Sequence, residues 1–372
     1  MIYFDNAATS FPKPPCVIKE LNKCLRSYCG NPGRSSHDLS LKASEKIYSA
    51  REEISGLLNL EAPESIVFTQ NATHALNLAI KSFIKEDCHV LTSDFEHNSV
   101  IRPLEKLKQA MGISYSIFDS DGNVEENILA SINENTTGII CSIASNVTGQ
   151  KIDLSLLSRI TTENNLFLII DASQAIGHMN IDLKKTPVDA LCAPGHKALF
   201  GIQGSGFAYF KDKYRKESLM EGGSGSESIN PYMPLLLPEG YEAGTLSTPA
   251  IASLGRGVKY VKDIGVDEIE HKLNVLTLLL EERLYNLPKV KLYKSGNGIL
   301  SFNVKDIPSS RIASLLNEHK ICVRGGLHCA PSIHKKLCTL NQGAVRLSFS
   351  YLNKFSEIDS FYKLLRAVTR DL

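Results

Sequence analysis

Two short segments, 26 positions apart in the chain, constrain its fold most. The apolar run Leu166–Ile170 leads without interruption into Asp171, which is typical of a buried strand of a parallel sheet. The run Val188–Ala193 has the same character, and Lys197 follows it after a short turn. Ligands bind at the carboxyl ends of such strands. The pattern therefore predicts that Asp171 and Lys197 face each other across one crevice.

A carboxylate and a lysine in one crevice are the two groups that pyridoxal phosphate requires. A lysine amine forms a Schiff base with a carbonyl when desolvation or nearby positive charge lowers its pKa. An aspartate keeps the ring nitrogen of the cofactor protonated. Taken alone, Lys197 fits a surface position beside a helix cap better than a reactive site. Its pairing with Asp171 favours pyridoxal phosphate as the cofactor.

Five motifs, in this order along the chain, resemble those of fold-type I pyridoxal-phosphate enzymes of aminotransferase class V. They are Asp171-Ala-Ser-Gln174, Pro194-Gly-His-Lys197, Glu242-Ala-Gly-Thr245, Arg324-Gly-Gly-Leu-His-Cys329-Ala and Arg346-Leu-Ser. Within that class they are most similar to the cysteine desulfurase and selenocysteine lyase group. The resemblance runs from Tyr3 to about Asn353. Five motifs in order are far more specific than any one of them.

Strand and helix patterns alternate from about residue 60 to 210, which predicts an α/β fold with a doubly wound, mostly parallel sheet. The resemblance implies the fold-type I transferase fold. We expect an arm at 1–14 that lines the active site, a large cofactor-binding domain at 15–248, and a small C-terminal α+β domain at 249–372. The small domain would carry the cysteine loop and a carboxylate-binding arginine. No G-x-G-x-x-G motif follows the first strand, which weakens a dinucleotide-binding alternative.

The charge composition limits the kinds of binding partner that the protein can be expected to have. The 41 Lys and Arg residues nearly balance the 40 Asp and Glu residues, and a net charge of +1 gives no electrostatic case for nucleic acid or a membrane surface. No apolar run approaches the roughly 18 residues of a membrane span, and the start of the chain lacks a targeting pattern. We therefore expect a cytoplasmic protein that acts on small molecules.

The nine cysteines are scattered without a C-x-x-C pair, so we expect no disulfide framework. The densest group of Cys and His residues lies near the end of the chain, and its spacing matches no familiar zinc pattern, so we predict no metal site. That group consists of Cys322, His328, Cys329, His334 and Cys338.

The resemblance implies a cofactor site residue by residue. Ala72 and Thr73 begin a helix whose N–H groups would hold the phosphate, although a plain helix cap would look the same. His97 would stack on the pyridine ring, while the alternative for a lone histidine after a strand is a solvated loop residue. The other expected cofactor contacts are Asn146 and Gln174 to the phenolic oxygen, Asp171 to the ring nitrogen, Lys197 to the aldehyde, His196, and Thr245 to the phosphate in the neighbouring subunit.

Pro194 departs from the family pattern. Members usually have Ser or Thr at this position, which donates to the phosphate, whereas proline offers neither a hydroxyl nor an N–H. Two outcomes stay open: a weaker hold on the phosphate, or compensation by Thr73, His196 and Ser205. His74 also stands where many members carry a glutamate, with an effect that the sequence leaves open.

Cys329 is the candidate nucleophile, because a cysteine beside His328 and near Arg324 can exist partly as a thiolate. By resemblance Lys197 and His97 complete the catalytic group, and Arg346 clamps the substrate carboxylate through its two-pronged guanidinium. Arg324 and Ala7 are further candidates for substrate binding. The implied reaction converts L-cysteine to L-alanine and leaves a persulfide on Cys329.

Other functions stay open at the level of sequence. A selenocysteine lyase acting on L-selenocysteine has the same motifs, and a class V aminotransferase or epimerase would share the fold without needing the thiol. A scaffold or sulfur-carrier partner without pyridoxal phosphate is a third alternative, which the intact Asp171, Gln174 and Lys197 argue against. The resemblance also implies a homodimer, through Thr245, and a sulfur-acceptor protein as a further partner.

Overall fold

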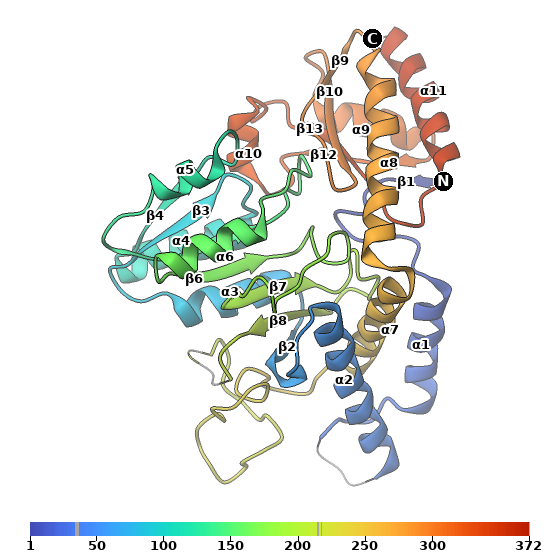
Figure 1. The fold of residues 1–372 in the computed structure, drawn as a ribbon. Coiled ribbons are helices and arrows are strands. Elements are labelled where there is room, and N and C mark those ends of the chain that lie inside the picture. The colour runs from blue at the N-terminus through green and yellow to red at the C-terminus, as the bar shows by residue number, and fades with distance from the viewer. Residues whose placement is uncertain (34–36, 214–215, 217, 372) are drawn as a thin grey trace.

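The computed structural model describes residues 1–33, 37–213, 216 and 218–371. Its centre is a seven-stranded sheet in the order β2-β8-β7-β6-β5-β3-β4 (Figure 1). The neighbouring strands from β7 to β4 pair in parallel, and β8 runs antiparallel to both β7 and β2. The strands are β2 (Ile66–Thr69), β3 (His89–Ser93), β4 (Ser114–Phe118), β5 (Thr136–Ser142), β6 (Phe167–Asp171), β7 (Ala190–Pro194) and β8 (Gly206–Phe210).

Both faces of this sheet are covered, which explains the unbroken apolar runs in the sequence. Side chains alternate along a strand, so a strand buried on both faces needs apolar residues throughout. On β6, Ile169 packs into the cluster that contains α3 and α4, whereas Leu168 and Ile170 pack into the cluster on the other face, with α2, α6 and α7. These helices are α2 (Asp38–Leu57), α3 (Ala72–Phe83), α4 (Asn98–Met111), α6 (Leu154–Glu163) and α7 (Thr248–Ile264).

A second, four-stranded antiparallel sheet in the order β12-β13-β10-β9 forms the upper part of Figure 1. Its strands are β9 (Val290–Leu292), β10 (Ile299–Val304), β12 (Arg324–Gly326) and β13 (Ala344–Ser348), accompanied by α8 (Val266–Tyr285), α9 (Ser309–Glu318), α10 (Pro331–Lys336) and α11 (Phe355–Asp371). The N-terminal strand β1 (Ile2–Tyr3) pairs in parallel with β11 (Ile321–Cys322). The start of the chain is therefore joined to this C-terminal part.

Helix α7 connects the two parts and packs against α1 (Pro15–Ser27) and α2. It approaches the segment after Lys197 so closely that a Cβ at Gly257 would lie 2.0 Å from the Leu199 carbonyl oxygen. Only glycine allows that approach. The domain bounds predicted from the sequence stay predictions.

The remaining short elements are α5 (Val124–Leu129) and a 3-10 turn (Pro63–Ser65). Residues 34–36, between α1 and α2, lie outside the described part of the chain. No helix in the described part of the chain is long and apolar enough to cross a membrane.

Candidate active site

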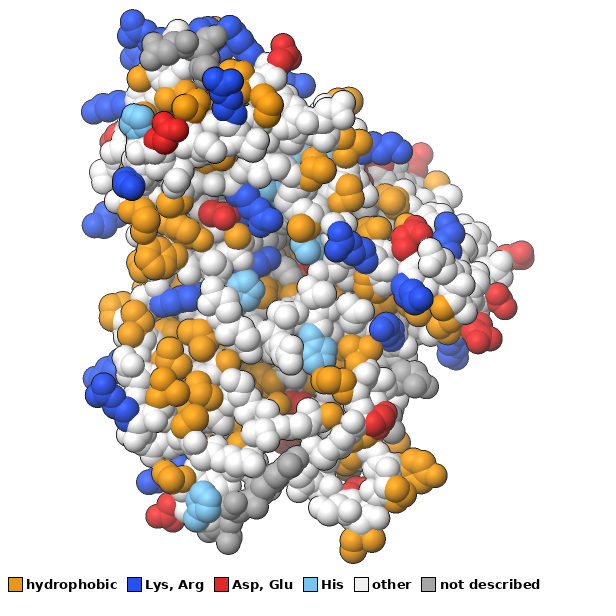
Figure 2. All heavy atoms as spheres, turned by 180° about the vertical axis from the view of Figure 1, so that it is seen from behind, with side chains coloured by type: hydrophobic (Ala, Val, Ile, Leu, Met, Phe, Trp, Pro, Cys, Tyr) orange, Lys and Arg blue, Asp and Glu red, His pale blue; other side chains and the backbone are white. Residues whose placement is uncertain are grey.

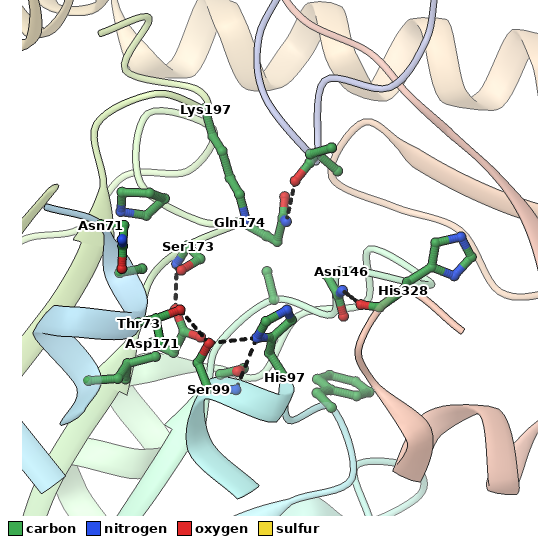
Figure 3. A pocket seen from close by; sticks show the side chains of 18 of the residues that line it. Asn71, Thr73, His97, Ser99, Asn146, Asp171, Ser173, Gln174, Lys197 and His328 are labelled. Carbon is green, nitrogen blue, oxygen red and sulfur yellow. Dashed lines mark hydrogen bonds between the residues drawn. The ribbon is translucent and has the colours of Figure 1, made fainter. Parts of the chain in front are cut away.

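A cavity of about 210 Å³ opens where the carboxyl ends of the parallel strands meet the N-terminal arm and the second sheet. The residues that the sequence predicted for the site line this cavity, except Cys329, Thr245 and Ser205. Figure 3 shows the side chains of Lys197, Gln174, Asp171, Thr73, His97 and Asn146 around it. The structure also adds lining residues that the sequence analysis did not assign. They include Asn71, Phe95, Ser99, Ser142, Ser173 and His328.

Asp171 and Lys197 share this cavity, as the two strand ends predicted. Asp171 is the last residue of β6, and its Oδ1 accepts a hydrogen bond from the Ser173 N–H at 2.9 Å. Lys197 follows β7 after one turn and is partly buried. Burial lowers the pKa of Lys197 to about 8, with Asp171 opposing the shift and Arg346 adding to it. The amine is thus far closer to its neutral, nucleophilic form than an exposed lysine.

The N-terminus of α3 forms one wall of the cavity. Asn71 caps the helix, because its Oδ1 accepts from the His74 N–H at 2.9 Å. The N–H groups of Ala72 and Thr73 belong to the first turn, which has no preceding helical carbonyls to bond. They lie at the positive end of the helix dipole, so this wall suits an anion such as a phosphate.

Two of the three residues expected to compensate for Pro194 line the cavity, namely Thr73 and His196. The third, Ser205, does not. It is buried outside the cavity lining, and its hydroxyl donates to the Ile202 carbonyl at 2.6 Å. The expectation for Ser205 is therefore wrong.

Ser99 links the N-terminus of α3 to His97, and the sequence analysis did not assign it a role. Its Oγ lies 2.7 Å from Thr73 Oγ1 and 2.8 Å from His97 Nδ1. The Ser99 N–H also donates to Nδ1 at 3.1 Å, so Nδ1 is an acceptor and the ring proton sits on Nε2. Burial lowers the pKa of His97, which keeps the ring neutral near pH 7. The contact with His97 is local, because His97 caps the helix that contains Ser99, whereas the contact with Thr73 joins two helices and has no local signal in the sequence.

The side-chain amides of Gln174 and Asn146 line the cavity and make different hydrogen bonds. Gln174 Nε2 donates to the Ala7 carbonyl at 3.0 Å, so the amide holds the N-terminal arm in place. Asn146 Nδ2 donates to the His328 carbonyl at 2.7 Å. The Asn146 Oδ1 is buried without a hydrogen-bond partner among the described residues. A buried polar atom of this kind costs free energy, and a ligand group can relieve the cost.

Two guanidinium groups meet in the same cavity, because Arg324 on β12 and Arg346 on β13 are direct cross-strand partners. Arg346 is almost fully buried and donates to Asp5 Oδ1 at 2.7 Å and to the Asn146 carbonyl at 3.0 Å. Its Nε is buried without a partner in the described structure. Asp5 was not assigned a role from the sequence. Together with Lys197, these arginines give the cavity an excess of positive charge, which suits an anionic ligand.

The N-terminal arm is tied to the residue before Lys197. The His196 carbonyl accepts hydrogen bonds from Lys13 Nζ at 2.8 Å and from the Ser10 N–H at 3.1 Å, and His196 Nδ1 lies 3.1 Å from Thr9 Oγ1. Burial lowers the pKa of His196 to about 4, with Lys197 adding to the shift. His196 is therefore neutral at pH 7.

Cys329 is exposed and does not line the cavity, although the neighbouring His328 does. Both residues have left-handed backbones, with φ of 52° at His328 and 57° at Cys329. Such conformations cost roughly 1–3 kcal/mol each. Two contacts hold them, since the His328 carbonyl accepts from Asn146 and the Cys329 carbonyl accepts from the Asn98 N–H at 2.7 Å. The thiol is thus presented from a fixed backbone beside the cavity.

His328 does not supply the positive charge expected beside the thiol. Burial lowers the pKa of His328 well below its ordinary value, and Arg346 adds to the shift. The neutral ring turns inward, away from solvent, and contacts His334. The described residues contain no group of three or more His, Cys, Asp or Glu side chains that could hold a metal ion.

Thr245 lines a different cavity, between α2 and the segment that precedes α7. That cavity also contains Arg51 and Glu242, which form a buried ion pair at 2.6 Å. Thr245 therefore has no contact with the site of its own chain in this structure.

The fold and this site define a class of protein. The family model for aminotransferase class V matches residues 2–361, so the chain belongs to that family. The predicted family and the predicted α/β fold class are both confirmed.

Two curated relatives and one solved structure named as cysteine desulfurases are similar to this chain over nearly its whole length. The chain is 32% identical to a probable cysteine desulfurase of Pyrococcus abyssi, over 100% of this chain and 95% of that protein. It is 31% identical to a probable cysteine desulfurase of Methanothermobacter thermautotrophicus, over 99% and 94%. A solved apo structure of cysteine desulfurase from Thermococcus onnurineus NA1 matches with a TM-score of 0.93 and 29% identity, over 100% of this chain and 95% of that one.

Proposed function

We propose that this protein is a pyridoxal-phosphate-dependent cysteine desulfurase, which converts L-cysteine to L-alanine and receives the sulfur on Cys329. The observation that carries the proposal is the meeting of Asp171 and Lys197 in one cavity, with the arginine pair on its wall and Cys329 at its side. The family membership and the names of the similar proteins support it.

The residues present fit the cofactor. The first-turn N–H groups of Ala72 and Thr73 would hold its phosphate, and the Asp171 carboxylate would hold its ring nitrogen. The partnerless Asn146 Oδ1 offers an acceptor to a donor on a bound ligand. When bound through Lys197, pyridoxal phosphate supplies an electron sink for the substrate's α-carbon.

The chain's own residues would then do the rest of the work. The arginine pair Arg324 and Arg346 binds the substrate carboxylate, and the lowered pKa of Lys197 lets its amine take and return the α-proton. The Cys329 thiolate attacks the substrate sulfur, so a sulfur–sulfur bond forms while the substrate's carbon–sulfur bond breaks. The β-carbon gains a proton, and the balance is one cysteine plus one enzyme thiol giving one alanine plus one enzyme persulfide.

The direct test is to mix protein loaded with pyridoxal phosphate with L-cysteine, without an added thiol, and to measure alanine and protein-bound persulfide. We expect one alanine per active site in a first burst, with an equal amount of persulfide. Added dithiothreitol should then permit continued turnover, because it removes the persulfide sulfur.

Other reaction products would indicate a different enzyme activity. Alanine from L-selenocysteine but none from L-cysteine would identify a selenocysteine lyase. A 2-oxo acid or the D-amino acid in place of alanine would identify an aminotransferase or an epimerase. No reaction with cysteine in protein that has taken up the cofactor would rule the desulfurase out.

We also propose that the protein is a homodimer in which each Thr245 serves the partner's phosphate site. Thr245 lies away from the cavity of its own chain, and the loop after β8 carries exposed apolar side chains at Ile229, Tyr232 and Leu235. Figure 2 shows apolar side chains on the loop that protrudes from the lower part of the molecule. Light scattering at micromolar concentration should give twice the mass of 40.9 kDa. A fully active monomer would contradict the proposal.

A further inference from the structure

A chain of buried hydrogen bonds runs from the strand before the cysteine loop to the residues after it. His328 Nε2 lies 3.3 Å from the Arg324 carbonyl, and His328 Nδ1 lies 3.2 Å from His334 Nε2. His334 Nδ1 lies 2.8 Å from Thr339 Oγ1. All three side chains are buried, and His334 is fully inaccessible. None of these contacts is used by the proposed chemistry.

The direction of each hydrogen bond follows from the Arg324 carbonyl, which can only accept. His328 Nε2 must therefore carry the ring proton, and in a neutral ring Nδ1 is then an acceptor. His334 Nε2 must donate to it, so His334 Nδ1 accepts from the Thr339 hydroxyl. Burial supports neutral rings, because it lowers the pKa of His334 to about 4 and that of His328 well below its ordinary value. Thr339 Oγ1 also lies 3.4 Å from the His334 carbonyl, but its contact with Nδ1 is the shorter one.

The helix that carries His334 is itself fixed to the central sheet. Lys336, the last residue of α10, donates to Asp94 Oδ2 at 2.6 Å and to Asp119 Oδ1 at 2.5 Å, and lies 3.0 Å from Asp121 Oδ2. Asp94 follows β3, and the other two follow β4. A displacement of the ring of His334 is therefore opposed by the helix behind it.

We propose that His334 is a positioning residue for the Cys329 thiol. By donating to His328 it locks that ring under the loop, and the ring holds the left-handed backbone at His328 and Cys329 that presents the thiol beside the cavity. This inference rests on the proposed function for its catalytic consequence, but the hydrogen-bond chain can be tested without it.

The test compares four variants. His334→Phe keeps a ring but removes the donor, whereas His334→Gln can place an amide N–H where Nε2 was. Thr339→Val removes the donor to Nδ1 and lets the ring of His334 reverse its protonation. His319→Phe, at an exposed histidine next to α9, is the control. Amide hydrogen exchange of residues 326–330 is measured in the protein without cofactor, and nitrogen-15 shifts report the protonation of each ring nitrogen in the wild type.

We expect exchange in 326–330 to be at least about tenfold faster in His334→Phe, and alanine formation to fall in kcat by a similar factor. Cofactor uptake and KM for cysteine should stay within about twofold. His334→Gln should recover most of the loss, Thr339→Val should lie between the two, and His319→Phe should behave as wild type.

Several results would overturn the proposal. They are unchanged exchange and unchanged kcat in His334→Phe, a His328 with an unprotonated Nε2, or a His334→Gln that is as impaired as His334→Phe. Loss of cofactor uptake in parallel with kcat would show that His334 is only structural. If His334→Phe does not fold, the ring protonation in the wild type and the exchange in His334→Gln and Thr339→Val still decide. If the wild type makes no alanine, the proposed function is wrong. The hydrogen-bond chain is then still tested by the exchange and nitrogen-15 measurements, which do not depend on activity.

Discussion

Lys197→Ala is expected to abolish covalent attachment of pyridoxal phosphate and to lower alanine formation from cysteine by a factor on the order of 10⁴ or more. The reason is that Lys197 is the amine that shares the cavity with Asp171, and its pKa of about 8 makes it reactive near neutral pH. The measurements are visible absorbance, borohydride reduction followed by peptide mass spectrometry, and alanine release.

The same residue gives a pH test in protein stripped of cofactor. Burial lowers the pKa of Lys197, so the neutral amine accumulates as the pH rises through about 8 instead of near 10.5. Uptake of added pyridoxal phosphate should therefore rise with a midpoint near pH 8 and level off only at higher pH. Lys185→Ala, at an exposed lysine, is the control and should match wild type. A borohydride-reducible adduct at full occupancy in Lys197→Ala would show that another lysine holds the cofactor.

The sequence could predict the central sheet because its strands are buried on both faces. Leu166–Ile170 reads as one apolar run for that reason, and the carboxylate that follows it is the last residue of β6. The position of strand ends along one sheet edge then brings Asp171 and Lys197 together without any knowledge of loops. This part of the site depends on hydrophobic periodicity and on strand direction, and both can be predicted from short stretches of the sequence.

Contacts between distant segments could not be predicted in this way. Ser99 touches Thr73 only because the starts of α3 and α4 meet at the cavity, and Asp5 reaches Arg346 only because the N-terminal arm lies beside β13. Ser205 was misjudged for a different reason, since its hydroxyl donates to the nearby Ile202 carbonyl and the residue does not line the cavity. The inward turn of His328 toward His334 likewise depends on how α10 packs.

Cys329→Ser is expected to separate the two halves of the proposed reaction. The variant should take up pyridoxal phosphate and bind cysteine normally, because Lys197, Asp171 and Arg346 are untouched. It should lose alanine and persulfide formation from cysteine by roughly 10³-fold or more, since a hydroxyl is a far weaker nucleophile toward sulfur than a thiolate. Cofactor absorbance, a cysteine binding titration and alanine release measure the three steps.

The chain offers a closely matched control, because Cys338 is also an exposed cysteine with a left-handed backbone, at φ 56°. Cys338→Ser should retain wild-type alanine release, and an alkylating tag for persulfide should mark Cys329 alone in the wild type. With selenocysteine the loss in Cys329→Ser should be smaller, because selenium is the better leaving group and can depart without attack by a thiol. Unchanged alanine release from both substrates in Cys329→Ser, with no tag on Cys329 in the wild type, would mean that this thiol is structural. The exposed cysteine beside the cavity would then need another explanation for its fixed, left-handed backbone.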